Sequence, residues 1–170
     1  MSQRTLSISH FELPPSDNHI RDIGYRFING KRRACIVYTK EADNFKKSVV
    51  RRINDAYFFE VQEFARAHRP WMTYKLTTVF VFAPEDILTA GWLKGTAKSP
   101  YKRVDTKNRS KLLDDALSEA IGIDDSLFFE GPVIKLVGGD DDPPAVHLVL
   151  TEEDPTAYGV PTHYLRGPHG

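Results

Sequence analysis

The sequence has a single cysteine, no apolar run long enough to cross a membrane, and no net charge over its 170 residues. One cysteine excludes an internal disulfide, and the apolar segment 34–38 around Cys35 favours a buried, inert thiol over a nucleophile. No stretch approaches the roughly 18 apolar residues of a membrane helix, and the N-terminus lacks the apolar core of a signal peptide. We therefore expect a cytoplasmic protein.

Local motifs for metal or nucleotide binding are also scarce. The histidines at positions 10, 68, 147, 163 and 169 lack the spacing of metal ligands, so ordinary surface or core positions are favoured. A glycine-rich phosphate loop is missing, because Gly138 and Gly139 precede three aspartates that repel a nucleotide unless a cation bridges them. The length fits one domain, and 41% apolar with 27% charged residues is ordinary and names no function.

The zero net charge hides a strong segregation of charge along the chain. Residues 1–111 hold 21 Lys and Arg against 11 Asp and Glu, whereas residues 112–170 hold 2 against 12. These counts give net charges of +10 and −10 for the two parts. The basic part is suited to contact nucleic-acid phosphates. Alternatively, the two parts pair in the fold and cancel each other.

Hydrophobic periodicity and turn residues predict the order of the elements. Asn29-Gly30 is typical of a two-residue hairpin turn, and Gly122 of a helix end. The predicted elements are a strand over 6–13, a hairpin of strands 24–28 and 31–38, a helix over 40–68, a strand over 73–82, a helix over 108–121, and strands over 127–137 and 145–150. We expect one α+β domain over 1–153, with a mixed β-sheet, a long central helix and a shorter helix that carries the active site, and a flexible tail over 154–170.

Basic residues gather in three further segments. The hairpin strand that begins Lys31-Arg32-Arg33 has either a solvated edge that blocks aggregation or a phosphate contact. The cations of the helix predicted over 40–68 lie off its apolar face, which indicates a solvated surface rather than a binding site. In the irregular connection 83–103, Trp92 and Tyr101 accompany several cations and either suit an unpaired base with its phosphate or pin the loop to the core. These loop cations are Lys94, Lys98, Lys102 and Arg103.

The most informative motif runs from Asp105 to Asp125. An Asp precedes a helix, an Asn follows three residues on, a Lys lies in the first turn, a D-A-L follows, and a Gly-x-Asp-Asp ends the segment. These residues are Asp105, Asn108, Lys111, Asp115-Ala116-Leu117 and Gly122-Ile123-Asp124-Asp125. Together with the opening Pro14-Pro15-Ser16-Asp17-Asn18, the pattern resembles that of the RusA-like Holliday-junction resolvases. The two motifs lie in the same order and cover both ends of residues 11–130.

The resemblance implies a homodimeric endonuclease of a bacterial or phage-infected cell. Each subunit would use Mg²⁺ or Mn²⁺ to cut one strand of a four-way or branched DNA junction, leaving a 5′-phosphate. It implies catalytic roles for Asp105, Asp125 and Lys111, and a metal held by Asp105, Asp125 and Asp124. Residues expected to contact DNA are Lys94, Lys98, Lys102, Arg103, Lys107, Asn108, Arg109 and Asn18, and Ser16 and His19 are candidates to line the site from the first turn.

Lys107 departs from the family pattern, which has a second Asp two residues after the first. A site without that carboxylate either holds its metal through Asp105 and Asp125, with Asp124 or Glu130 compensating, or is weakened or inactive. The second case predicts a non-catalytic protein that binds branched or single-stranded DNA. A structural protein of a phage or prophage, without salt-dependent DNA affinity, is a third possibility.

The chemistry follows from charge. Phosphodiester hydrolysis gathers negative charge at an anionic phosphorus, so aspartates that hold Mg²⁺ near the phosphate offset that charge and activate water. Lys111 is suited to neutralise the leaving oxygen, or it simply pairs with Asp115 one helical turn later, in competition with Asp114. We expect neither Asp114 nor Asp115 to be catalytic.

Helix length raises a geometric problem. A helix over 108–121 is about 21 Å long, which places Asp105 and Asp125 at opposite ends. Either the helix ends early and the chain doubles back, or a two-fold dimer brings Asp125 of one subunit near Asp105 of the other. We favour one subunit, because Gly122 permits a chain reversal.

Overall fold

The computed structural model describes residues 3–10, 12–16, 20–102, 104–139 and 143–165. The main sheet has the order β1 (Thr5–His10), β7 (Ala145–Glu153), β4 (Thr73–Phe82), with β5 (Phe128–Glu130) and β6 (Val133–Val137) both paired with β4. β7 is antiparallel to β1 and β4, whereas β5 and β6 are parallel to β4. The predicted α+β class with a mixed sheet is therefore confirmed.

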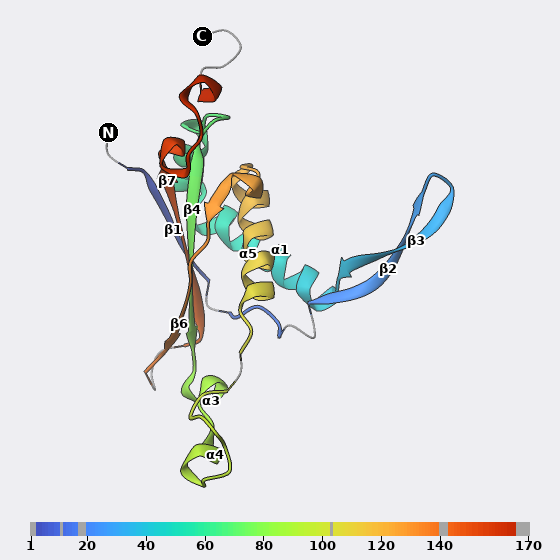
Figure 1. Cartoon of the computed structure of the whole chain (residues 1–170), viewed down its shortest axis with the longest axis vertical. Helices are drawn as coiled ribbons and strands as arrows, with labels where there is room; N and C mark the ends of the chain where they lie inside the picture. The colour runs from blue at the N-terminus through green and yellow to red at the C-terminus, as the bar shows by residue number, and fades with distance from the viewer. Residues whose placement is uncertain (1–2, 11, 17–19, 103, 140–142, 166–170) are drawn as a thin grey trace.

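Strand β4 lies at the centre of the sheet and has the predicted bounds. Its alternate residues from Tyr74 to Phe82 are buried, as expected for a strand with one face on the core. On that face lie α1 (Lys40–Ala56), α2 (Phe58–Arg66) and α5 (Lys107–Ile121), so the body has two layers (Figure 1). Val49 of α1 and Leu113 of α5 are fully buried in the core between the layers.

The predicted single helix over 40–68 is wrong, because the chain breaks at Tyr57 into α1 and α2. Tyr57 leaves helical geometry with φ −127° and ψ 21°. Its hydroxyl accepts a hydrogen bond from the Ser9 backbone N–H at 3.1 Å, which ties the break to β1. Asn54 and Asp55 just before it are weak helix formers. The apolar face continues across the break through the buried Val61 and Phe64.

The predicted strand over 127–137 is likewise two strands, β5 and β6. Gly131 and Pro132 separate them, and proline has no N–H to donate to a ladder. The Pro132 carbonyl still accepts a hydrogen bond from Thr78 N at 2.9 Å, so both strands follow the same edge of β4. The chain that leaves α5 therefore returns alongside the centre of the sheet.

The predicted hairpin is confirmed and is longer than expected. β2 (Arg21–Ile28) and β3 (Lys31–Tyr38) pair antiparallel, with Ile28 opposite Lys31. Asn29 and Gly30 have φ of 52° and 73°, the positive values that a type I′ turn requires. The two strands form a separate sheet that projects from the body (Figure 1). We call this hairpin, Arg21–Tyr38, the arm.

The connection 83–103 contains two one-turn helices, α3 (Pro84–Ile87) and α4 (Ala90–Leu93), and extends beyond one end of the sheet (Figure 1). After η2 (Asp125–Leu127) and the sheet, the predicted tail has two 3-10 helices, η3 (Pro155–Tyr158) and η4 (Thr162–Leu165). Residues 166–170 lie outside the described part of the chain. Within the described residues, no helix has the length and apolar character needed to span a membrane.

Candidate active site

The N-terminal end of α5 positions Asp105. The helix begins at Lys107, one residue before the predicted start, and Asp105 Oδ1 accepts a hydrogen bond from Lys107 N at 2.9 Å. Thr106, between them, is buried and anchors the turn. This local bond satisfies a backbone donor at the start of the helix and leaves Asp105 exposed to solvent.

The C-terminal end of α5 returns Asp125 toward the same helix. Gly122 ends α5 with φ 69°, a left-handed conformation that favours glycine. Ile123 is buried immediately after it, at 2% exposure, and fixes the direction of the reversal. Asp124 Oδ1 then accepts a hydrogen bond from Ser126 N at 2.8 Å and caps η2. The pKa of Asp124 is lowered by its bonds to Ser126, and its capping role positions Asp125.

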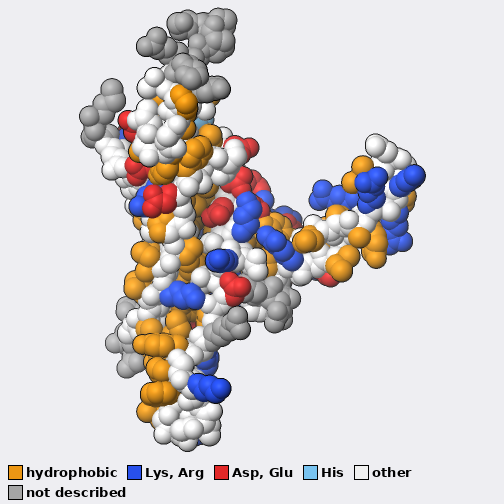
Figure 2. Space-filling model, viewed as in Figure 1, with side chains coloured by type: hydrophobic (Ala, Val, Ile, Leu, Met, Phe, Trp, Pro, Cys, Tyr) orange, Lys and Arg blue, Asp and Glu red, His pale blue; other side chains and the backbone are white. Residues whose placement is uncertain are grey.

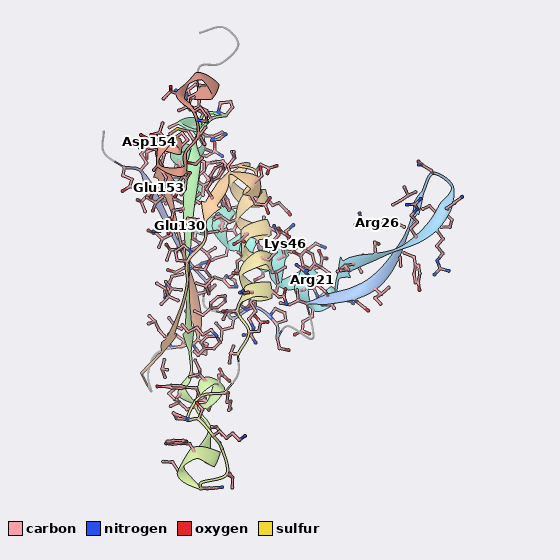
Figure 3. The ribbon with its side chains drawn as sticks, viewed as in Figure 1. Arg21, Arg26, Lys46, Glu130, Glu153 and Asp154 are labelled. Carbon is pink, nitrogen blue, oxygen red and sulfur yellow. The ribbon has the colours of Figure 1, made fainter. Side chains whose placement is uncertain are left out.

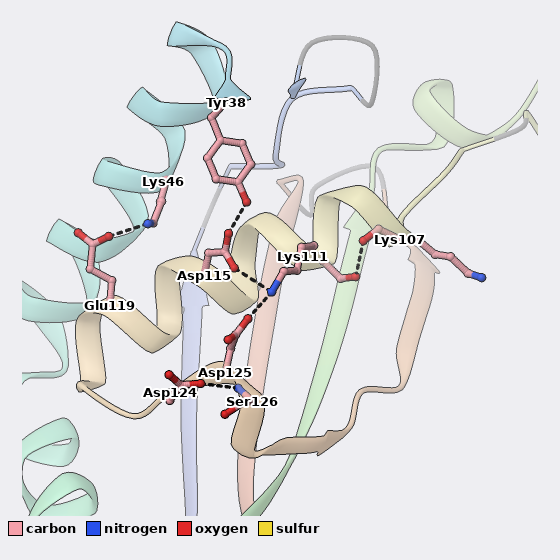
Figure 4. A network of polar contacts seen from close by, with 10 residues as sticks. Tyr38, Lys46, Lys107, Lys111, Asp115, Glu119, Asp124, Asp125 and Ser126 are labelled. Atoms are coloured by element: carbon pink, nitrogen blue, oxygen red, sulfur yellow. Dashed lines mark hydrogen bonds and ion pairs between the residues drawn. The ribbon is translucent and has the colours of Figure 1, made fainter. Parts of the chain in front are cut away.

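Lys111 is the centre of the polar network (Figure 4). Its ammonium contacts Asp125 Oδ2 and lies 3.0 Å from Asp115 Oδ1. The hydrogen bond with Asp125 is the main cause that raises the pKa of Lys111, so this side chain stays cationic at neutral pH. The predicted pair with Asp115 thus forms, and the contact with Asp125 forms as well.

Tyr38 connects the root of the arm to this network. Its hydroxyl donates a hydrogen bond to Asp115 Oδ2, the other oxygen of the carboxylate that pairs with Lys111. Burial, followed by the bond to Asp115, raises the pKa of Tyr38 to about 12. Tyr38 therefore remains a neutral donor, and Asp115 is held from two sides.

Asp114 adds a carboxylate with unusual proton affinity. Burial raises the pKa of Asp114 to about 6, and the charges of Asp115 and Asp125 add to this while that of Lys111 opposes it. Three carboxylates thus lie within electrostatic reach of one ammonium. Asp114 is therefore placed to change its protonation near pH 6.

The structure answers part of the geometric problem posed by the helix length, because it brings Asp125 to Lys111 but records no contact between Asp125 and Asp105 among the described residues. The helix does not end early, since α5 runs to Ile121, yet the chain doubles back and brings Asp125 to Lys111. Lys111 lies only about 6 Å along the helix axis from Lys107, at 1.5 Å per residue. The contact between Asp125 and Lys111 is made within one chain and needs no second subunit.

The residues expected to contact DNA differ in their surroundings. Lys94, Lys98 and Lys107 are exposed, and Lys102, also exposed, donates a hydrogen bond to the Glu85 carbonyl. In the same loop Trp92 and Tyr101 are 49% and 63% exposed, which favours a surface role over pinning the loop to the core.

Two of the expected DNA contacts on α5 are partly covered. Asn108 is half-buried, and Arg109 is half-buried with its guanidinium 6.0 Å from the centre of the Phe82 ring. Arg109 therefore packs toward the sheet. Arg103, Asn18 and His19 lie outside the described residues, and Ser16 is exposed.

The sequence reasoning missed Tyr38, the raised pKa of Asp114 and the pocket beside Tyr38. A pocket of about 380 Å³ separates the arm from α5 and is lined by Arg21, Arg26, Ile36, Val37, Tyr38, Lys111 and Asp115. The spacing from Lys111 to Asp114 and Asp115 was a local signal for the acids. The contact between Tyr38 and Asp115 spans 77 residues and had none.

The donors near Lys111 are of the type that Mg²⁺ prefers, since all are carboxylate oxygens. The described part of the chain contains no group of three or more His, Cys, Asp or Glu placed to hold a metal ion. Mg²⁺ commonly uses only one or two protein carboxylates, with waters and substrate phosphates as its other ligands. Asp105 and Asp125 supply oxygens of that kind, and Asp125 would be available to a metal only if the Lys111 ammonium moved away from it.

Comparison with models of protein families and with curated proteins gives no match for this chain.

Proposed function

We propose that this protein is a metal-dependent endodeoxyribonuclease that cuts four-way or branched DNA, as the RusA-like resolvases that it resembles would. One observation carries the proposal. The chain reverses at Gly122 and places Asp125 in contact with Lys111, in the N-terminal half of the helix whose first backbone N–H bonds to Asp105. Lys111 of the sequence motif is thus bonded to Asp125, from the other end of that motif, although 14 positions separate the two residues.

The roles follow from charge and protonation. Asp105 and Asp125, with Asp124, would hold Mg²⁺ or Mn²⁺, which when bound would offset charge at the scissile phosphate and help to activate water. The attacking water oxygen forms a bond to phosphorus as the bond to the 3′ oxygen breaks, leaving a 5′-phosphate. Lys111 keeps its proton, so we assign it the neutralisation of the leaving oxygen. The DNA would lie across the exposed Lys94, Lys98, Lys102 and Lys107.

A second function is favoured by the contacts of Lys111 itself. Its ammonium already pairs with Asp115 and Asp125, and Lys107 adds another cation where the family pattern has a carboxylate. A site compensated by its own lysines is suited to bind DNA without a metal. The second candidate is therefore a non-catalytic protein that binds branched or single-stranded DNA. For both candidates a homodimer and a cytoplasmic location remain part of the proposal.

The test is cleavage of a synthetic four-way junction in Mg²⁺ or Mn²⁺, with Asp125→Asn as the variant. Asp55→Asn is the control, because Asp55 is an exposed helix residue that pairs only with Arg51 among the described contacts. We expect the wild type and the control to cleave, and Asp125→Asn to lose about a hundredfold or more in rate. Absence of cleavage by the wild type, or unchanged cleavage by Asp125→Asn, overturns the nuclease. Junction binding in chelator without cleavage in any divalent metal supports the binding protein instead.

A further inference from the structure

The arm carries a concentration of positive charge that the site does not use. Within Arg21–Tyr38 there are five cations and a single acid, Asp22, so the arm is +4 in a chain of zero net charge. The cations are Arg21, Arg26, Lys31, Arg32 and Arg33, and all are exposed. Figure 2 shows Lys and Arg side chains gathered on the far half of the arm. None of the ion pairs among the described residues joins an arm cation to a carboxylate.

The register of the hairpin sorts these side chains onto two faces. Arg26 lies opposite Arg33, and Ile28 opposite Lys31, which makes one face basic near the turn. The other face carries Tyr25 opposite Ala34 and Phe27 opposite Arg32. This second face is therefore mainly apolar and aromatic.

The aromatic face is open to solvent. Phe27 is 77% and Tyr25 58% exposed, and the Arg32 guanidinium lies 4.0 Å from the centre of the Tyr25 ring. Flat aromatic and guanidinium surfaces on which an unpaired base can stack are thus adjacent on one face. A merely solvated edge that blocks aggregation needs charges but not exposed Phe and Tyr.

The root of the arm adjoins the candidate active site. Tyr38, at the end of β3, bonds to Asp115, and Arg21 and Arg26 line the pocket that Lys111 also lines. Figure 3 shows Arg21 at the root and Arg26 farther along the arm. A polyanion held at Lys111 would therefore extend along a row of cations. A two-stranded β-ribbon also has the width that the major groove of B-DNA admits.

We propose that the arm is a second DNA-binding surface, which takes up a branch of the substrate next to the active site. Arg26, Lys31 and Arg33 contact its phosphates, and Tyr25 and Phe27 stack with unpaired bases at the branch point. The inference rests on the proposed function only in its choice of branched DNA as the partner. It adds a site to the one predicted from the loop 83–103 and from α5.

The test measures equilibrium binding by the full-length protein to a synthetic four-way junction in chelator, over a range of salt concentrations. The charge variant is Arg26→Ala with Arg33→Ala, and the matched control is Arg66→Ala with Arg69→Ala, two exposed cations of the body. Removing two phosphate contacts should weaken binding about tenfold or more and reduce the slope of log K against log salt by about two. The control should change neither quantity.

The stacking variant is Tyr25→Ala with Phe27→Ala, and its control is Phe58→Ala with Phe59→Ala, exposed aromatics of α2. We expect about tenfold weaker binding to the junction and to single strands, with an unchanged salt slope. The charge variant keeps the test decisive if the stacking variant does not fold.

Three outcomes separate the possibilities. Binding by both arm variants equal to that of the wild type overturns the arm proposal, even where the junction is cleaved. Absence of cleavage, together with loss of binding by the charge variant, overturns the nuclease but supports the arm. A stacking variant that changes from dimer to monomer in sedimentation overturns the proposal, because the aromatic face then contacts a second copy of the chain.

Discussion

The cations of α5 and those of the arm have opposite surroundings. Lys111 on α5 contacts two carboxylates, whereas the arm cations face solvent without a described acidic partner. Ion pairs that join the basic and acidic parts of the chain also form in the body, between Lys46 and Glu119 at 2.6 Å and between Lys75 and Glu130 at 3.0 Å. The two parts thus partly cancel, as one interpretation of the sequence held, but the cancellation is confined to the body.

This difference in pairing indicates where external anions can bind. A cation that is already paired must exchange its partner, whereas an unpaired one only loses water and mobile ions. Among the described residues, the body therefore pairs much of its charge internally, whereas the arm cations have no carboxylate partner. The following changes test that difference, ordered by their expected effect on the free energy of unfolding.

Asp114→Asn should give the largest change, because it removes a half-buried acid whose charge is poorly compensated. A pKa raised from 3.8 to about 6 means that folded protein binds the proton more tightly, so wild-type stability falls as pH rises from about 4 to about 6. The variant should lack this fall and be more stable at pH 7, by at most about 3 kcal/mol. Urea unfolding at pH 4 and pH 7 measures it. Equal pH dependence in the two proteins would contradict the assigned burial.

Gly122→Ala should come next, because the reversal that brings Asp125 to Lys111 depends on a positive φ. No atom lies within 4 Å of an added Cβ at Gly122, so the cost is conformational and about 1–2 kcal/mol. Urea unfolding of the variant measures it. Gly131→Ala is the control, because Gly131 has no positive φ and an added Cβ meets its nearest atom at 3.9 Å. A cost no larger than that of the control would show that the turn tolerates a side chain.

Lys111→Met should have a smaller effect, about 1 kcal/mol of destabilisation at neutral pH, because both partners are partly exposed. It leaves Asp115 and Asp125 without their ammonium, so binding of Mn²⁺ should become tighter while cleavage is lost. A thermal-shift titration with Mn²⁺ checks the first effect. Weaker binding of the metal than in the wild type would contradict a lysine that competes with it. Lys47→Met, which removes an exposed i,i+4 pair with Asp43, is the control.

Arg26→Ala with Arg33→Ala should have the smallest effect on stability, within about 0.5 kcal/mol of the wild type, because these side chains are exposed and lack described ion pairs. Chemical denaturation measures this difference, next to the large change expected in DNA affinity. A stability loss of several kcal/mol would mean that Arg26 or Arg33 forms a stabilising contact with another part of the chain.

Elements specified by local residues were predictable from the sequence. The bounds of β4 follow from its run of Thr, Val, Tyr and Phe, the turn from Asn29-Gly30, and the end of α5 from Gly122. The break at Tyr57 had only a weak local signal in Asn54 and Asp55, and the hydrogen bond that ties it to Ser9 spans 48 positions. The break between β5 and β6 had a local signal, since Pro132 interrupts the run.

The site was predictable where spacing along a helix determines it. The pair of Lys111 and Asp115 follows from an i,i+4 relation. The contact with Asp125 needed a reversal that the sequence allowed but did not specify, and the raised pKa of Asp114 depends on burial by distant elements. Cys35, expected to be buried, lies half-buried on the arm, because an apolar run there faces solvent.

The arm joins the body at its root, so a small rotation there moves the turn at its far end by a larger distance. Each of its strands has 8 residues, which corresponds to a length of about 27 Å at 3.4 Å per residue. A tilt of about 10° at the root would then displace the turn by about 5 Å, more than the spacing of base pairs along DNA. The hydrogen bond from Tyr38 to Asp115 lies at that root. This contact between the Tyr38 hydroxyl and the Asp115 carboxylate, beside Lys111, therefore helps to set the position of the turn at the far end of the arm.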